Sequence, residues 1–174
     1  LPLPTNANCL LPIAYLQMTV PNNFSISDIL VTVRRYWGYT ELRPLQEQAI
    51  KAGLEQRDSL VVMPTGGGKS LCYQVPPELA QRTDIVVSPL ISLMKDQVDG
   101  LRECGYPAAA LYSGMTPEEL RRTEEQMLEG RFRLVFVAPE RLLTTRFLQL
   151  VERLEIRAFE IGRASCRERV SSVV

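Results

Sequence analysis

The sequence predicts an α/β fold in which a mostly parallel sheet carries helices on both faces. Three observations support this prediction: short β-branched runs alternate with amphipathic helical patterns, glycine-containing turns separate them, and one apolar run leads through a glycine-rich loop into a helix. Parallel strands need long crossover connections, and helices are the usual ones. The 174 residues, of which 45% are hydrophobic, suffice for one such domain and its core.

Four short apolar runs have the length of buried strands, and three of them contain β-branched residues. They are Ser59–Met63, Asp84–Ser88, Ala108–Tyr112 and Arg133–Val137. A fifth run, Ile156–Ile161, is expected to begin one more strand. We expect these runs to lie side by side in a single sheet, because helical patterns separate most of them.

Helical patterns occupy the intervals between these runs. The segment Ser25–Asp28 is a capping box, and the helix that follows it is expected to end at Gly38. Pro44 suits the first turn of a second helix, which continues to Leu54. Apolar residues at helical spacing predict three further helices, which run from Ile91 to Leu101, from Thr116 to Gly130 and from Leu142 to Leu154.

Charge and composition exclude several classes of protein. The 20 basic and 20 acidic residues give a formal charge of zero, which excludes a uniformly basic nucleic-acid binder. Because the chain has no histidine, it has no His general base and no His metal ligand. No apolar run reaches the ~20 residues of a membrane-spanning helix, so no membrane partner is expected. The four cysteines are far apart in the sequence, which favours reduced thiols and a cytoplasmic location.

Both ends of the chain differ from its middle. Residues 1–17 carry no charge and three prolines, which indicates either a non-native upstream extension or a short disordered leader. Residues 160–174 begin with EIGRASCRERV, which resembles the translation of a sequencing adapter; a basic, solvated tail is the alternative. This segment holds three Arg and two Glu, so the remainder has 17 basic and 18 acidic residues. Any nucleic-acid partner must therefore be recognised by local chemistry.

The loop Pro64–Ser70 is the most specific feature of the sequence. Glycines at positions 66, 67 and 68 allow backbone N–H groups to converge on phosphate oxygens, and a helix N-terminus follows. Lys69 would reach the β- and γ-phosphates of ATP, while the Ser70 hydroxyl would hold Mg²⁺. We expect the nucleotide to be bound by Thr65, Gly66, Gly67, Gly68, Lys69 and Ser70.

Four motifs in a fixed order resemble the RecQ family of superfamily-two DNA helicases. Met63–Pro77 resembles motif I of that family, in which Met commonly replaces the first glycine of the general phosphate-loop pattern. Trp37–Ile50 resembles motif zero, Val86–Leu101 resembles motif Ia, and Leu134–Leu142 resembles motif Ib. The resemblance implies that residues 18–159 form a partial first RecA-like ATP-binding lobe.

Residues of motif zero have the chemistry to recognise adenine. An aromatic face and a planar guanidinium can both stack on the base, which suits Tyr39 and Arg43. The Gln46 amide offers a donor beside an acceptor, and this pair matches the N6/N7 edge of adenine. Helix capping and surface packing are the structural alternative for these three residues.

Residues at two strand ends are candidates for contact with a nucleic-acid strand. Backbone amides and hydroxyls at a strand-to-helix junction can bind phosphates, and a nearby cation strengthens that binding. The candidates are Ser88, Pro89, Ser92, Lys95 and Arg141. For the side chains of Lys95 and Arg141, ordinary strand-to-helix loops remain the alternative.

The resemblance implies an ATP-dependent DNA helicase, with three-prime to five-prime strand separation, in the cytosol or nucleoid of a bacterial-type cell. The family's next motif is Asp-Glu-Ala-His, which supplies the magnesium-orienting acid and the catalytic base. Here the chain reads Ile156–Gly162 without that motif, so we expect a lobe truncated before it and inactive as printed.

The expected partner is single-stranded or forked DNA, and the oligomeric state stays open. A stand-alone, non-catalytic nucleotide- or DNA-binding module is the alternative; a small-molecule kinase is disfavoured because no arginine-rich lid follows Ser70.

Overall fold

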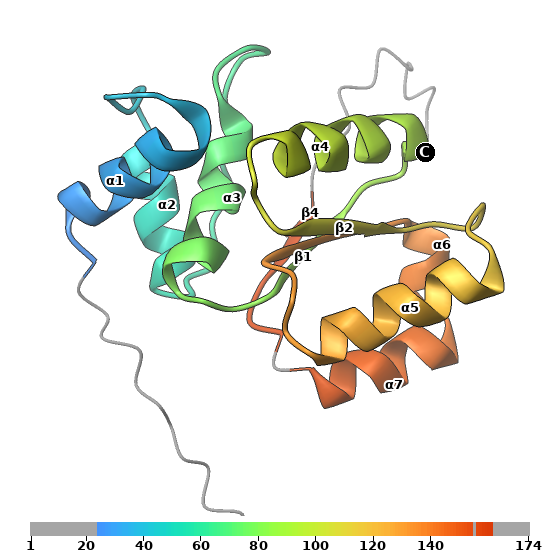
Figure 1. The fold of residues 1–174 in the computed structure, drawn as a ribbon. Helices are drawn as coiled ribbons and strands as arrows, with labels where there is room; N and C mark the ends of the chain where they lie inside the picture. The colour runs from blue at the N-terminus through green and yellow to red at the C-terminus, as the bar shows by residue number, and fades with distance from the viewer. Residues whose placement is uncertain (1–23, 155, 162–174) are drawn as a thin grey trace, which may run out of the picture.

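The computed structural model describes residues 24–154 and 156–161. The expected leader, residues 1–17, and residues 162–174 of the expected foreign tail lie outside the described residues. The described part is built on a four-stranded, fully parallel sheet with the strand order β2-β3-β1-β4 (Figure 1). The strands are β1 (Asp84–Val87), β2 (Ala108–Leu111), β3 (Leu134–Val137) and β4 (Phe159–Ile161).

Helices cover both faces of the sheet, as the sequence predicts. Figure 1 shows α4 on one face, α5 and α7 on the opposite face, and α1, α2 and α3 grouped beside the sheet. The bounds are α1 Ile26–Trp37, α2 Gln46–Leu54, α3 Lys69–Leu79, α4 Ile91–Glu103, α5 Pro117–Leu128, α6 Pro139–Leu142 and α7 Thr145–Arg153. None of the described helices is long and apolar enough to cross a membrane.

The core has one layer on each face of the sheet because side chains of a strand alternate between the faces. Val86 and Phe136 pack under α4, whereas Ile85 and Val135 pack against α5 and α7. A third cluster joins the three helices beside the sheet, and its buried members are Ile29, Val33, Ile50, Leu54, Leu71 and Val75. The phosphate loop therefore belongs to a packed helical layer next to the sheet.

Helix ends confirm the capping signals of the sequence. Ser25 and Thr116 each form a complete capping box, in which the hydroxyl accepts the N–H of the third helical residue. Gly38 ends α1 in the left-handed conformation at φ +73°. The expected helix from Leu142 to Leu154 is wrong at its start: α7 begins at Thr145, because the Thr144 hydroxyl caps it by accepting the Phe147 N–H, and Leu142 belongs to the separate short helix α6.

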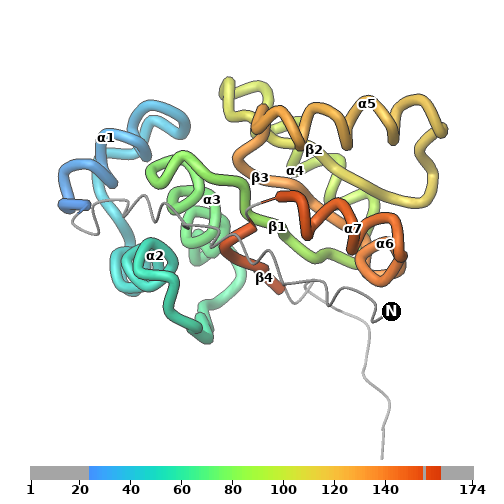
Figure 2. The backbone as a smooth tube through the Cα atoms, turned by 90° about the horizontal axis from the view of Figure 1, so that it is seen from below, coloured from blue at the N-terminus to red at the C-terminus, as the bar shows by residue number. Residues whose placement is uncertain are grey.

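One expected strand is absent from the described part of the chain. Residues 59–63 form no strand, and Leu60 and Val62 are 92% and 77% exposed. A β-branched run becomes a strand only where it pairs with a neighbouring strand, and this run pairs with none in the described part of the chain. Figure 2 shows β4 on the side of the sheet nearer to α3. The expected fifth strand forms, but it begins at Phe159 rather than Ile156.

Candidate nucleotide and nucleic-acid site

The phosphate loop reaches the N-terminus of α3 through two glycines with left-handed backbone angles. Gly66 and Gly68 have φ values of +78° and +79°, which residues with a Cβ rarely adopt. A Cβ on Gly67 would lie 2.9 Å from the Pro64 carbonyl oxygen, whose hydrogen bond with the Gly67 N–H spans 3.0 Å. Glycine at all three positions is therefore required by the path of the loop.

The donors of the loop suit an anion. Gly68 is the N-cap residue of α3 and provides no side-chain cap, so the first-turn N–H groups remain open to a ligand. Lys69 is exposed, and its ammonium donates to the carbonyl oxygens of Met63 and Pro64 over 3.0 and 2.8 Å. These carbonyls are neutral acceptors, and phosphate oxygens form stronger, charge-assisted bonds with an ammonium. Thr65 lies exposed on the loop and Ser70 is half-buried in the first turn of α3.

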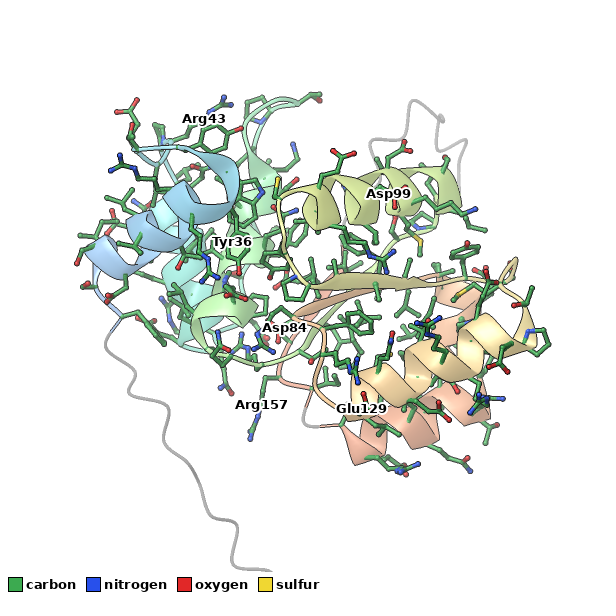
Figure 3. The ribbon with its side chains drawn as sticks, viewed as in Figure 1. Tyr36, Arg43, Asp84, Asp99, Glu129 and Arg157 are labelled. Atoms are coloured by element: carbon green, nitrogen blue, oxygen red, sulfur yellow. The ribbon has the colours of Figure 1, made fainter. Side chains whose placement is uncertain are left out.

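Arg43 and Gln46 are brought directly onto this loop. The Gln46 amide nitrogen donates to the Gly68 carbonyl over 2.8 Å, and its oxygen accepts the Arg43 backbone N–H over 2.7 Å. The Arg43 guanidinium, labelled in Figure 3, donates to the Gly66 carbonyl. Gln46 is only 1% exposed. Both ends of its amide thus bond the protein itself, whereas Tyr39 is 55% exposed.

No cluster of three His, Cys, Asp or Glu side chains that could hold a metal lies among residues 24–154 and 156–161. A Mg²⁺ ion at this loop would take the Ser70 hydroxyl as its protein ligand and phosphate oxygens as the others, which is the common arrangement for this hard cation. Burial raises the pKa of the neighbouring Cys72 thiol, so this thiol stays protonated at neutral pH. Burial, together with the Asp84 carboxylate, raises the pKa of Glu160 on β4.

The candidate nucleic-acid residues gather where the parallel strands end. Ser88 directly follows β1 and is buried, and its N–H donates to the Val137 carbonyl over 3.1 Å. Pro89, Ser92 and Lys95 are exposed on the loop before α4 and on its first turns. Arg141 lies in α6, and its Nε is buried with no hydrogen-bond partner among the described residues.

The residue at the end of β2, Tyr112, was not among the nucleic-acid contacts predicted from the sequence. Tyr112 directly follows β2, and the Lys95 ammonium lies 4.7 Å from the centroid of its ring. A cleft of about 550 Å³ between α4 and α5 is lined by both residues. An aromatic residue at the end of an apolar run is typical of a strand, so the sequence carries no separate signal for this role.

The fold and the loop together define a P-loop α/β domain. Residues 43–160 match the family model described as DEAD/DEAH box helicase, and the chain belongs to this family. It is 41% identical over 132 residues to the ATP-dependent DNA helicase RecQ of Bacillus subtilis, and 41% identical over 137 residues to that of Haemophilus influenzae. These alignments cover 75% and 79% of this chain but 22% of each relative, so the chain spans about a fifth of their length.

Two solved structures share the fold. A hypothetical ATP-dependent RNA helicase from Sulfolobus tokodaii superposes with a TM-score of 0.61 at 16% identity, covering 78% of this chain and 50% of that one. The RNA helicase Prp28 from Chaetomium thermophilum bound to ADP gives 0.52 at 18% identity, covering 80% and 45%. At such identities the similarity shows the fold alone, which is that of RecA-like helicase domains.

Proposed function

We propose that this chain is the ATP-binding and DNA-contacting part of a RecQ-type, ATP-dependent DNA helicase motor that separates strands in the three-prime to five-prime direction. The single observation that carries this proposal is the loop Gly66–Ser70, which presents an exposed ammonium and an uncapped helix N-terminus. Adenosine triphosphate is the anion that such a motor consumes, with Mg²⁺ as its counter-ion.

The names of the proteins that are similar to this chain in sequence favour DNA over RNA as the nucleic acid. The relatives near 41% identity are named as DNA helicases, whereas the RNA helicases of the same fold stand at 16% and 18%. Single-stranded or forked DNA would lie across the strand ends, where Ser88, Ser92 and Lys95 are found. A cytosolic or nucleoid location, with reduced cysteines, is consistent with such a substrate.

Nucleotide binding would proceed by exchange of hydrogen bonds at the loop. Lys69 would leave the carbonyls of Met63 and Pro64 and take phosphate oxygens instead, while the open N–H groups of α3 complete the cradle. Ser70 would hold Mg²⁺, which neutralises phosphate charge when it is bound. The residues of this chain thus bind and orient the triphosphate.

Adenine would be recognised by residues 39–46, two of which also contact the phosphate loop. Tyr39 and Arg43 would stack on adenine, and Gln46 would bond its N6/N7 edge. Because the Gln46 amide nitrogen donates to the Gly68 carbonyl, adenine must compete with that carbonyl for it. Adenine recognition and loop conformation are therefore linked in this proposal.

We propose further that the printed chain binds ATP without turning it over. Phosphoryl transfer to water needs a base and neutralisation of the developing charge. The printed sequence holds no histidine and no Asp-Glu-Ala-His motif, and Glu160, with its raised pKa, lies in β4 rather than on the phosphate loop.

Binding of a fluorescent ATP analogue tests the proposal. Lys69→Ala removes the ammonium and should abolish binding, while Lys51→Ala is the matched control because Lys51 pairs with Glu47 on the exposed face of α2. Gln46→Ala should weaken the binding of ATP more than that of pyrophosphate, because the lost amide would contact adenine as well as the Gly68 carbonyl. Equal affinity of the Lys69 variant and the unmodified chain, or equal binding of GTP and ATP, would contradict the assignment.

A further inference from the structure

The carboxyl ends of three strands lie in one row across the sheet. Tyr112, Ala138 and Ser88 are the residues that directly follow β2, β3 and β1, and the parallel pairings place these strand ends in register. The N–H groups of Ala138 and Ser88 both continue the ladder by donating to a neighbouring strand over 3.1 Å. Tyr112 is therefore the outermost member of the row that also carries the proposed DNA contacts.

The ring of Tyr112 is partly buried and packs against the core cluster beneath α4. Gly114 lies close to the ring, and a Cβ on Gly114 would meet it in ordinary contact at 3.4 Å. A ring packed on the core can hold a cation over its face while losing little conformational freedom of its own.

Lys95 is the cation that this ring holds. Its ammonium lies 4.7 Å from the ring centroid, within the range of an attractive cation–π contact. A lysine side chain on a helix surface otherwise samples many rotamers, and ordering it on binding weakens binding. The contact with Tyr112 restricts the side chain before any ligand arrives.

Two of the other charged side chains that line the cleft have hydrogen-bond partners. Arg102 donates its Nε to the Ala108 carbonyl over 3.0 Å, and Glu119 closes the capping box of Thr116. The charged residues that line the cleft are Lys95, Asp99, Arg102, Glu119 and Arg122. The Lys95 ammonium lies over the Tyr112 ring, and its charge also helps to lower the pKa of Glu119 across the cleft.

We propose that Tyr112 is a positioning residue for single-strand binding, whose ring holds the Lys95 ammonium at the mouth of the cleft between α4 and α5, where it contacts a backbone phosphate. This inference rests on the proposed DNA-contacting function and adds a residue to it. The ring acts through Lys95 and does not itself contact the strand.

A double-mutant cycle on the full 174-residue chain tests the inference. The affinity for fluorescein-labelled oligo(dT) is measured by anisotropy at several KCl concentrations for Lys95→Ala, Tyr112→Leu, Tyr112→Phe and the Lys95→Ala/Tyr112→Leu double variant. Tyr112→Leu should weaken binding roughly threefold, and Tyr112→Phe, which keeps the ring face, should leave it unchanged. Lys95→Ala should reduce the magnitude of the slope of log K against log[KCl] by about 0.7, which is the contribution of one phosphate contact. Adding Tyr112→Leu to Lys95→Ala should cause no further loss of affinity.

Additive losses in the double variant, or no loss in Tyr112→Leu, overturn the inference while leaving the proposed function intact. A chain that binds the fluorescent ATP analogue but no oligo(dT) overturns the inference and the DNA half of the proposed function. Failure to bind either ligand overturns both entirely. If Tyr112→Leu lowers the melting temperature, Tyr112→Met fills the same space without a ring and is scored by the same cycle.

Discussion

Removal of Arg82 should destabilise this domain far more than removal of any exposed arginine. Asp84 begins β1 and is only 1% exposed, so its carboxylate depends on the guanidinium of Arg82. Three hydrogen bonds of 2.9, 3.2 and 3.1 Å join the two groups, and Arg82 also donates to the Gly53 carbonyl at 2.9 Å (Asp84 is labelled in Figure 3). Arg82→Met leaves a buried charge without its partner, at a cost of about 3–5 kcal/mol.

The assay is urea denaturation followed by far-UV circular dichroism. The matched control is Arg57→Met, because Arg57 pairs with Glu55 while both side chains remain exposed at 63% and 43%. That change should cost at most about 1 kcal/mol. The Arg82→Met/Asp84→Asn double variant removes the buried charge and should recover part of the lost stability.

The stability of Arg82→Met should also change with pH in a defined direction. Burial already raises the pKa of Asp84 above 3.8, and the hydrogen bond and charge of Arg82 oppose that rise. Without Arg82 the pKa rises further, so the folded state binds the proton more tightly than the unfolded state does. The stability of Arg82→Met should therefore fall as pH rises from the unfolded pKa through the raised folded value, and the deficit relative to the unmodified chain should shrink toward pH 4. A deficit equal to that of Arg57→Met, or one independent of pH, would refute this account of the pair.

Two further changes test the loop and a helix cap. A Cβ on Gly68 would lie 2.4 Å from the Gln46 amide nitrogen, and the residue has a φ of +79°. Gly68→Ala should therefore lower the free energy of unfolding by about 1–2 kcal/mol and weaken ATP-analogue binding. The control is Gly100→Ala, in open space on α4, which should be neutral or slightly stabilising in the same denaturation and binding assays. Thr116→Ala should cost about 1 kcal/mol through loss of the α5 cap. The Thr116 backbone N–H lowers the pKa of Glu119 more than the Thr116 hydroxyl does. Because Thr116→Ala keeps that N–H, the variant should retain most of the stability loss that occurs as pH falls through the lowered pKa of Glu119, and a Thr116→Ala melt with no acid-side loss would contradict this account.

Local patterns predicted the elements whose causes are local. Ser25 and Thr116 sit in capping boxes with all the necessary groups within four residues, and both boxes form. The runs around β1, β2 and β3 were recognisable from their own short apolar sequences between helical patterns. Helix α7 could not be separated from α6 by its apolar stripe, since the deciding group is the hydroxyl of Thr144.

Distant contacts account for what the sequence did not predict. The run at residues 59–63 has the composition of a strand, but strand formation depends on a partner supplied by another part of the chain. The sequence marked Gln46 for its amide chemistry, yet only the fold reveals that the amide bonds a carbonyl 22 residues away. Tyr112 escaped notice because its significance comes from Lys95, on a different element.

The phosphate loop of this chain is held from the helical side rather than from the sheet. The run before it pairs with no strand in the described part of the chain, whereas Gln46 and Arg43 bond the loop carbonyls and α3 packs on α2. On the proposed function, ATP must displace the Lys69 and Gln46 bonds to these carbonyls. For Gln46 this exchanges one neutral hydrogen bond, worth about 1 kcal/mol net, for another. For Lys69 it replaces neutral carbonyl acceptors by anionic phosphate oxygens, so the ammonium gains a partner of opposite charge. The exchange at Lys69 therefore favours the nucleotide, and the same residues that brace the empty loop become available to bind it.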